Sequence, residues 1–109
     1  MPGTLSVVAT PIGNLEDITM RALRVLRECD VVFCEDTRVT AKLLARYEIR
    51  KTMHRLDQHA GPAHVRTALD LLRAEKHIAL VTDAGTPGIS DPGNPFIARV
   101  IAELPGTRI

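Results

Sequence analysis

The chain has 109 residues, which leaves room for one domain, and its net charge of +1 lacks the basic excess typical of nucleic-acid-binding proteins. Only 3% of its residues are aromatic, so we expect an aliphatic core. The sequence shows neither a signal-peptide start nor an apolar run of the roughly 18 residues that span a membrane. Cys29 and Cys34 are not spaced as metal ligands. We therefore expect a cytoplasmic protein with no membrane segment and two buried, inert thiols.

Apolar runs and helix signals alternate along the whole chain. We predict strands at residues 5–9, 31–34 and 78–82, with a less clear edge strand at 52–56. Helical periodicity follows each strand. We place the helix starts after the N-caps Asp17 and Thr37, at Pro62, and at Pro95 with Asn94 as N-cap.

This order predicts the fold class α/β, a parallel sheet with helices on both faces. The predicted strands are continuous apolar runs, as expected for strands buried on both faces, and do not alternate between apolar and polar residues. Residues 105–109 have the pattern of a turn followed by the start of a further strand. We expect residues 1–109 to be the N-terminal α/β domain of a longer, two-domain protein.

Three polar or Gly/Pro-rich segments follow predicted strands, at the edge where open parallel sheets bind ligands. The first, Thr-Pro-Ile-Gly-Asn-Leu (residues 10–15), has one glycine, which disfavours a dinucleotide fingerprint and leaves a plain connector as the alternative. The second, Glu35-Asp36-Thr37-Arg38, offers two carboxylates and a guanidinium. Its structural alternative is a helix N-terminus with a Thr cap. The third, residues 83–93, is longer than a usual connection and resembles a ligand loop.

Other polar groups give weaker signals. His54, His64 and His77 have no partner at metal-ligand spacing, so no metal site is expected. His59 is better explained as a surface residue than as a site residue. Arg21, Arg24 and Arg27 recur every three residues, a pattern that usually marks a solvated helix face.

Taken together, three motifs resemble the ribosomal RNA small subunit methyltransferase I family, within the tetrapyrrole methylase superfamily. They are Val-Ala-Thr-Pro-Ile-Gly-Asn-Leu-Glu-Asp-Ile-Thr (8–19), Cys-Glu-Asp-Thr-Arg (34–38) and Leu-Val-Thr-Asp-Ala-Gly-Thr-Pro-Gly-Ile-Ser-Asp-Pro-Gly (80–93). The likeness spans essentially the whole chain, in order. It departs from the family at residues 57–61, Asp-Gln-His-Ala-Gly, where family members carry a His-Asp-His-Asn-Glu-like run and only Gln58 and His59 remain candidates for a family role.

The resemblance implies S-adenosyl-L-methionine as cofactor, 2′-O-methylation of a cytidine in 16S rRNA of the small ribosomal subunit, and a homodimer with the cofactor in a cleft between two domains. Carried over by position, the cofactor-binding residues would be Thr10, Pro11, Gly13, Asp83, Ala84, Gly85, Thr86 and Pro87. The catalytic residues would be Glu35, Asp36 and Arg38.

Two other functions fit the same residues. A related methylase acting on a corrin or porphyrin precursor would share the fold and the cofactor. The chain by itself would alternatively be a non-catalytic, dimerising module, since half of the expected cleft is missing. We expect the isolated chain to be inactive in methyl transfer.

Overall fold

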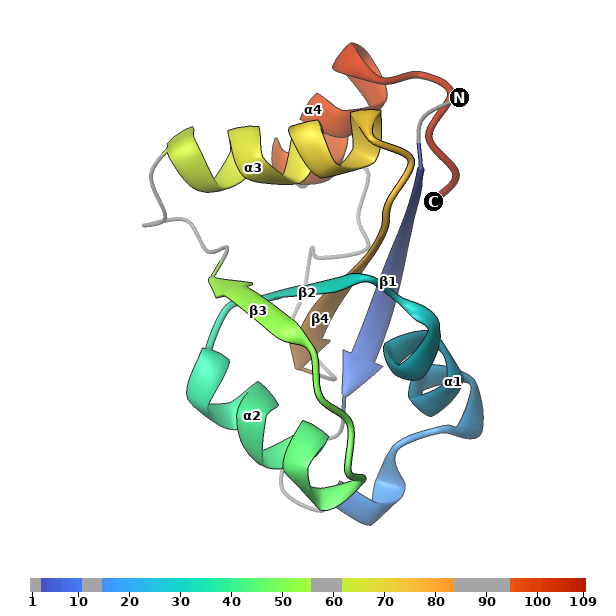
Figure 1. Ribbon diagram of the computed structural model, residues 1–109, viewed down its shortest axis with the longest axis vertical. Coiled ribbons are helices and arrows are strands. Elements are labelled where there is room, and N and C mark those ends of the chain that lie inside the picture. Colours follow the sequence, from blue (N-terminus) through green and yellow to red (C-terminus); the bar gives the residue numbers. More distant parts are fainter. Residues whose placement is uncertain (1–2, 11–14, 56–61, 84–94) are drawn as a thin grey trace.

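The computed structural model describes residues 3–10, 15–55, 62–83 and 95–109. Strands and helices alternate along these residues, as the sequence predicts (Figure 1). The elements are β1 (Thr4–Thr10), a short 3₁₀ helix (Leu15–Asp17), α1 (Met20–Glu28), β2 (Val31–Cys34), α2 (Thr37–Arg46), β3 (Thr52–Arg55), α3 (Pro62–Arg73), β4 (His77–Asp83) and α4 (Pro95–Glu103).

The four strands form one parallel sheet in the order β1-β4-β2-β3. The fourth strand lies between the first two, and a helix forms each connection between successive strands. The predicted strand at residues 52–56 is confirmed as β3, and it lies at the edge of the sheet. After α4 the chain returns to the other edge, where Arg108 forms a parallel bridge with Thr4.

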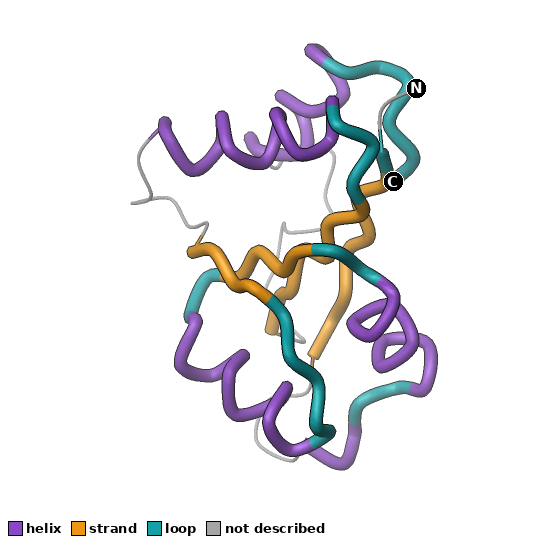
Figure 2. The backbone as a smooth tube through the Cα atoms, in the orientation of Figure 1, coloured by secondary structure: helices purple, strands orange, loops and turns teal. Residues whose placement is uncertain are grey.

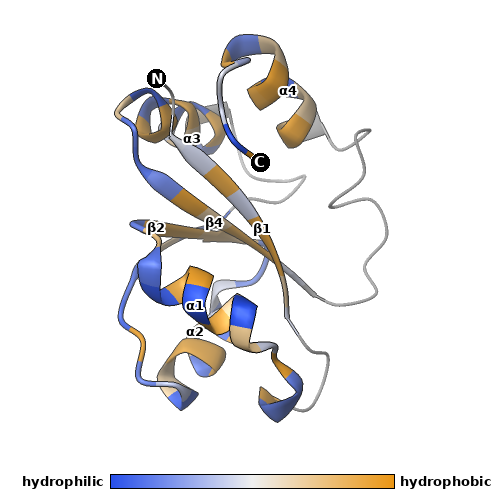
Figure 3. Cartoon of the chain, turned by 90° about the vertical axis from the view of Figure 1, so that its right-hand side faces the viewer, coloured by the Kyte–Doolittle hydropathy of each residue, from blue (hydrophilic) through white to orange (hydrophobic). Residues whose placement is uncertain are grey.

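Helices cover both faces of the sheet, which confirms the predicted fold class (Figures 2 and 3). Neighbouring residues of the central strands face opposite layers. In β4, Ile78 and Leu80 pack with α3 and α4, whereas Ala79 and Val81 pack with α1 and α2. Apart from Phe33, Cys29 and Cys34, the buried hydrophobic residues that the structure describes are aliphatic. Among the described residues, no helix is long and apolar enough to cross a membrane.

Two predicted helix caps were wrong. The side chain of Thr19, not Asp17, caps α1 by accepting a hydrogen bond from the backbone N–H of Ala22 at 3.0 Å. Asp17 instead ends the short 3₁₀ helix. At α2 the cap is Asp36, and Thr37 is the first helical residue. Both predictions failed because several good capping residues stand side by side, and composition does not select among them. Pro62 and Pro95 begin α3 and α4 as predicted, and Asn94 lies outside the described residues.

The amino edge of the sheet is closed by backbone contacts. The N–H of Gly3 donates to the carbonyl of Leu72 at 2.7 Å, and the N–H of Thr4 donates to the carbonyl of Lys76. A Cβ atom on Gly3 would lie 1.9 Å from the Lys76 carbonyl oxygen. Asp30 and His77 join the starts of β2 and β4 at the same edge. The backbone N–H of Asp30 donates to the carbonyl of His77, and the backbone N–H of His77 donates to Oδ2 of Asp30, both at 2.8 Å.

Candidate functional site

The carboxyl ends of the strands bring the predicted site segments to one edge of the sheet. Thr10, the last residue of β1, is the register partner of Asp83, the last residue of β4. Cys34, which ends β2, pairs with Val81 on the other side of β4. Glu35 and Asp36 follow Cys34 directly. Because the strands are parallel and adjacent, all three predicted segments start from this carboxyl edge, where α/β sheets bind their ligands.

Thr10 joins the two strands at this edge. Its side chain is buried, and its hydroxyl donates a hydrogen bond to the carbonyl of Thr82 at 3.0 Å. This bond fixes the end of β1 against β4 and gives Thr10 a structural role beside the predicted cofactor contact. Of the other predicted cofactor residues, Pro11, Gly13, Ala84, Gly85, Thr86 and Pro87 lie outside the described residues.

Asp36 is both the N-cap of α2 and the partner of Arg38. Its Oδ1 accepts a hydrogen bond from the Arg38 backbone N–H at 2.9 Å and lies 3.5 Å from the Arg38 Nε. The backbone hydrogen bond is the main reason that the pKa of this carboxyl is lowered, and the Arg38 charge adds to the effect. Asp36 therefore stays ionised at neutral pH. Arg38 extends into solvent with 90% of its side chain exposed, and Glu35 is also exposed.

Cys34 and Thr40 lie beneath this polar turn. Burial raises the pKa of the Cys34 thiol, although a hydrogen bond with the Thr40 side chain opposes the shift. Burial likewise raises the pKa of Cys29, despite the nearby Lys51 charge. The prediction of buried thiols is confirmed, and thiols held in the protonated form are poor nucleophiles. Sequence reasoning missed Thr40, whose only signal is its place on the inner face of α2 with Leu43 and Leu44.

Tyr47 is a second residue that the sequence did not single out. Its hydroxyl donates to the carbonyl of Leu15 at 2.7 Å, and Arg46, which stacks over the Tyr47 ring, lies 3.6 Å from Glu16. These contacts hold the C-terminal side of the first motif against the end of α2. No sequence signal could have found them, because the bonded residues lie 32 positions apart.

A surface hollow of about 570 Å³ lies between α2 and β3 and is unrelated to the predicted site. Residues such as Leu44, Ile49 and Met53 line it, together with the charged residues that link the two elements. None of the predicted site residues that the structure describes contributes to it. Within the ranges that the structure describes, no group of three His, Cys, Asp or Glu side chains is arranged to hold a metal ion.

Comparisons with known proteins agree with the fold and the motifs. The family model of the tetrapyrrole (corrin/porphyrin) methylases matches residues 4–109. Proteins named ribosomal RNA small subunit methyltransferase I are similar to the chain. The one from Borrelia garinii subsp. bavariensis is 50% identical over 91% of this chain and 44% of its own length. The one from Thermotoga maritima is 50% identical over 84% of this chain and 41% of its own length. The chain thus spans less than half the length of these relatives.

Two solved structures share the fold at lower identity. The uroporphyrin-III-C-methyltransferase of Thermus thermophilus aligns over 94% of this chain and 44% of its own, with a TM-score of 0.66 and 23% identity. The methyltransferase CobJ aligns over 98% of this chain and 45% of its own, with a TM-score of 0.66 and 18% identity. These likenesses show that the same α/β arrangement recurs in methyltransferase structures.

Proposed function

Since the chain belongs to the tetrapyrrole (corrin/porphyrin) methylase family, we propose that it forms the N-terminal half of an S-adenosyl-L-methionine-dependent methyltransferase that acts on 16S rRNA of the small ribosomal subunit. The observation that carries the proposal is the contrast in identity. The chain is 50% identical to two relatives named for ribosomal RNA, but 23% identical to the structurally similar porphyrin enzyme. The specific reaction proposed is 2′-O-methylation of a cytidine ribose.

The cofactor would lie at the carboxyl edge of β1 and β4. The residues present fit it, because Thr10 and Asp83 end adjacent parallel strands at matching register and both predicted cofactor segments continue from them. S-adenosyl-L-methionine supplies a methyl group that its sulfonium centre already activates. The contribution of Pro11, Gly13 and residues 84–87 would be close backbone approach, which Gly and Pro favour.

The cofactor contact has a direct test in the full-length protein. Gly85→Val should abolish S-adenosyl-L-methionine binding in calorimetric titrations, because the added side chain would fill space that the ligand needs. Thr40→Ser, which changes a buried residue behind the site, is the matched control and should bind normally. Normal affinity in the Gly85 variant would contradict the assignment.

The reacting ribose hydroxyl must be aligned and must lose its proton. We propose that Arg38 stabilises the oxygen as negative charge develops on it, since its guanidinium is exposed at the carboxyl edge. Asp36 would orient Arg38 through the contact between Oδ1 and Nε. The carboxylates of Asp36 and the neighbouring Glu35 are the two candidates to accept the proton.

Kinetics of the full-length protein test these roles. Arg38→Ala should lower kcat about 100-fold, the size of effect seen when one donor to a developing oxyanion is removed, with little change in cofactor affinity. Asp36→Ala should act in the same direction. Arg73→Ala is the matched control, because Arg73 forms a similar exposed pair with Asp70 on the opposite layer. Unchanged turnover in both site variants would remove the assignment.

The substrate class needs a separate assay. Methyl incorporation into small ribosomal subunits should exceed incorporation into porphyrin or corrin precursors, and the opposite result would make the chain part of a tetrapyrrole enzyme. We also propose that the full-length protein is a homodimer and that the isolated chain does not bind the cofactor. Sedimentation of the full-length protein and titration of the 109-residue chain test these two points.

A further inference from the structure

The two helix layers differ in charge. Helices α1 and α2, which cover one face of the sheet, contain six basic residues and a single acid, whereas α3 and α4 contain three basic residues and two acids. The basic residues of the first layer are Arg21, Arg24, Arg27, Arg38, Lys42 and Arg46. The near-neutral charge of the whole chain conceals this separation.

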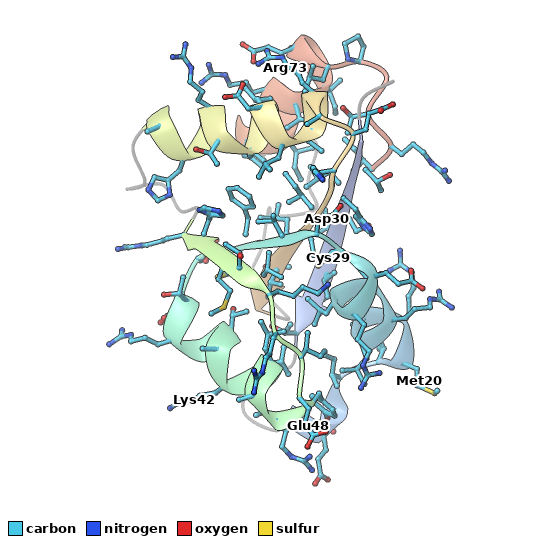
Figure 4. All side chains as sticks on the ribbon, viewed as in Figure 1. Met20, Cys29, Asp30, Lys42, Glu48 and Arg73 are labelled. Carbon is cyan, nitrogen blue, oxygen red and sulfur yellow. The ribbon has the colours of Figure 1, made fainter. Side chains whose placement is uncertain are left out.

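The basic side chains form a stripe on each helix, opposite its buried face. On α1 the three arginines are exposed, and Ala22, Val25 and Leu26 face the core. Their spacing extends the stripe over about 9 Å at 1.5 Å per residue. On α2, Arg38, Lys42 and Arg46 recur every four residues over about 12 Å. Lys42 points away from the sheet, and Arg73 lies on the opposite layer (Figure 4).

Ion pairs occur in both layers: in the first, Arg38 is paired with Asp36 and Arg46 with Glu16. Arg73 and Arg99 each have an acid on their own helix, at 3.2 Å from Asp70 and 3.5 Å from Glu103. Arg21, Arg24, Arg27 and Lys42 form no ion pair in the part of the chain that the structure describes. Like charges three or four residues apart on a helix destabilise it slightly, so helix stability does not account for these stripes.

We propose that Arg21, Arg24, Arg27 and Lys42, the α1/α2 basic surface, bind phosphate groups of the RNA substrate. The inference rests on the proposed function and names where on this chain the RNA lies. Guanidinium and ammonium groups on an exposed helix face suit phosphate, which they contact without reading sequence. Each of the two helices follows a strand that ends at the carboxyl edge.

The test compares two triple variants of the full-length protein that lose the same net charge. The test variant carries Arg24→Gln, Arg27→Gln and Lys42→Gln on the α1/α2 layer. The control carries Arg66→Gln, Arg73→Gln and Arg99→Gln on the α3/α4 layer, where all three arginines are exposed. Binding to a 16S rRNA transcript is followed by fluorescence anisotropy over a range of salt concentrations. Circular dichroism confirms that each variant folds.

A plot of log K for RNA binding against log salt concentration has a negative slope. If the three side chains contact three phosphates, this slope should become shallower by about 2 in the test variant and stay unchanged in the control. The test variant should also bind about tenfold more weakly at moderate salt. Equal behaviour of the two variants would overturn the proposal. So would unchanged RNA binding together with a lost affinity for vesicles of anionic phospholipid, which would identify a membrane as the partner.

Methyl transfer separates this inference from the proposed function. If the full-length protein methylates small subunits and the α1/α2 variant keeps its salt-dependent RNA binding, the basic surface is wrong and the enzyme assignment stands. If the full-length protein methylates only tetrapyrrole precursors, the enzyme assignment fails, and the RNA proposal fails with it.

Discussion

The two edges of the sheet are built differently. At the amino edge, backbone groups bond across elements: Gly3 to Leu72, Thr4 to Lys76, and Asp30 to His77. At the carboxyl edge, Thr10 makes one buried hydrogen bond across strands, but Glu35 and Arg38 are exposed and the hydrogen bond of Asp36 is local to its own turn. The difference indicates that the amino edge maintains the fold, whereas the carboxyl edge leaves charged groups available to a ligand. Substitutions at the amino edge should therefore reduce stability first.

The largest effect is expected at Gly3. Gly3→Ala should lower the free energy of unfolding by about 2 kcal/mol or more, because the new Cβ would meet the backbone carbonyl of Lys76 at 1.9 Å and neither backbone can move alone. Urea denaturation measures the change. Lys76→Ala is the matched control, since it removes an exposed side chain and leaves that carbonyl in place. Equal stability of the two variants would show that the amino edge is looser than its contacts suggest.

A smaller loss is expected at Asp30. Its Oδ2 accepts the hydrogen bond of the His77 backbone N–H at 2.8 Å, where β2 and β4 begin. Asp30→Ala should cost about 1 kcal/mol in urea denaturation, as for a single exposed hydrogen bond to a charged acceptor. Asp30→Asn keeps an acceptor oxygen and should lose less. An equal loss in the two variants would mean that the charge, rather than the hydrogen bond, stabilises this edge.

Most of the fold followed from the sequence because the periodicity of apolar residues records burial directly. The run at residues 31–34 became β2 with unchanged bounds, and the weaker signal at residues 52–56 became the edge strand β3. The strand order β1-β4-β2-β3 did not follow, since apolar runs carry no information about which strands are neighbours. The caps of α1 and α2 were missed by two residues and one residue among adjacent polar candidates.

The sequence predicted which segments form the candidate site, but not the contacts that hold them in place. Their meeting at the carboxyl edge follows from parallel strands, and the register of Thr10 with Asp83 agrees with it. The contact of Tyr47 with Leu15 was beyond sequence reasoning, because it depends on how the two elements pack. The arginines of α1 were predicted to lie on a solvated helix face, and all three are exposed.

A gain in stability is expected at Glu48, which links α2 to β3. Glu48 has a φ of 57°, a left-handed conformation that favours glycine. Its N–H bonds to Ala45, and the following residue, Ile49, bonds back to Leu44. Glu48→Gly should therefore raise the free energy of unfolding by about 0.5–1 kcal/mol. Glu48→Ala, which keeps the strain, should show no such gain. An equal gain in the glycine and alanine variants would mean that the lost charge, and not the backbone conformation, causes the change.

The smallest effect, at the carboxyl edge, is a pH dependence. Because the pKa of Asp36 is lower in the folded chain than its ordinary value of 3.8, the folded state favours the ionised form. This contribution is fully present above the ordinary value and is lost as the pH falls through the lowered one. Solvent screens it, since the group is exposed. Asp36→Asn keeps an acceptor for the Arg38 N–H but cannot titrate, so urea midpoints of the wild-type chain should approach those of the variant on acidification. If the urea midpoints of the wild-type chain and the variant differ by the same amount at neutral and acidic pH, Asp36 acts at this edge through its hydrogen bond and not through its charge.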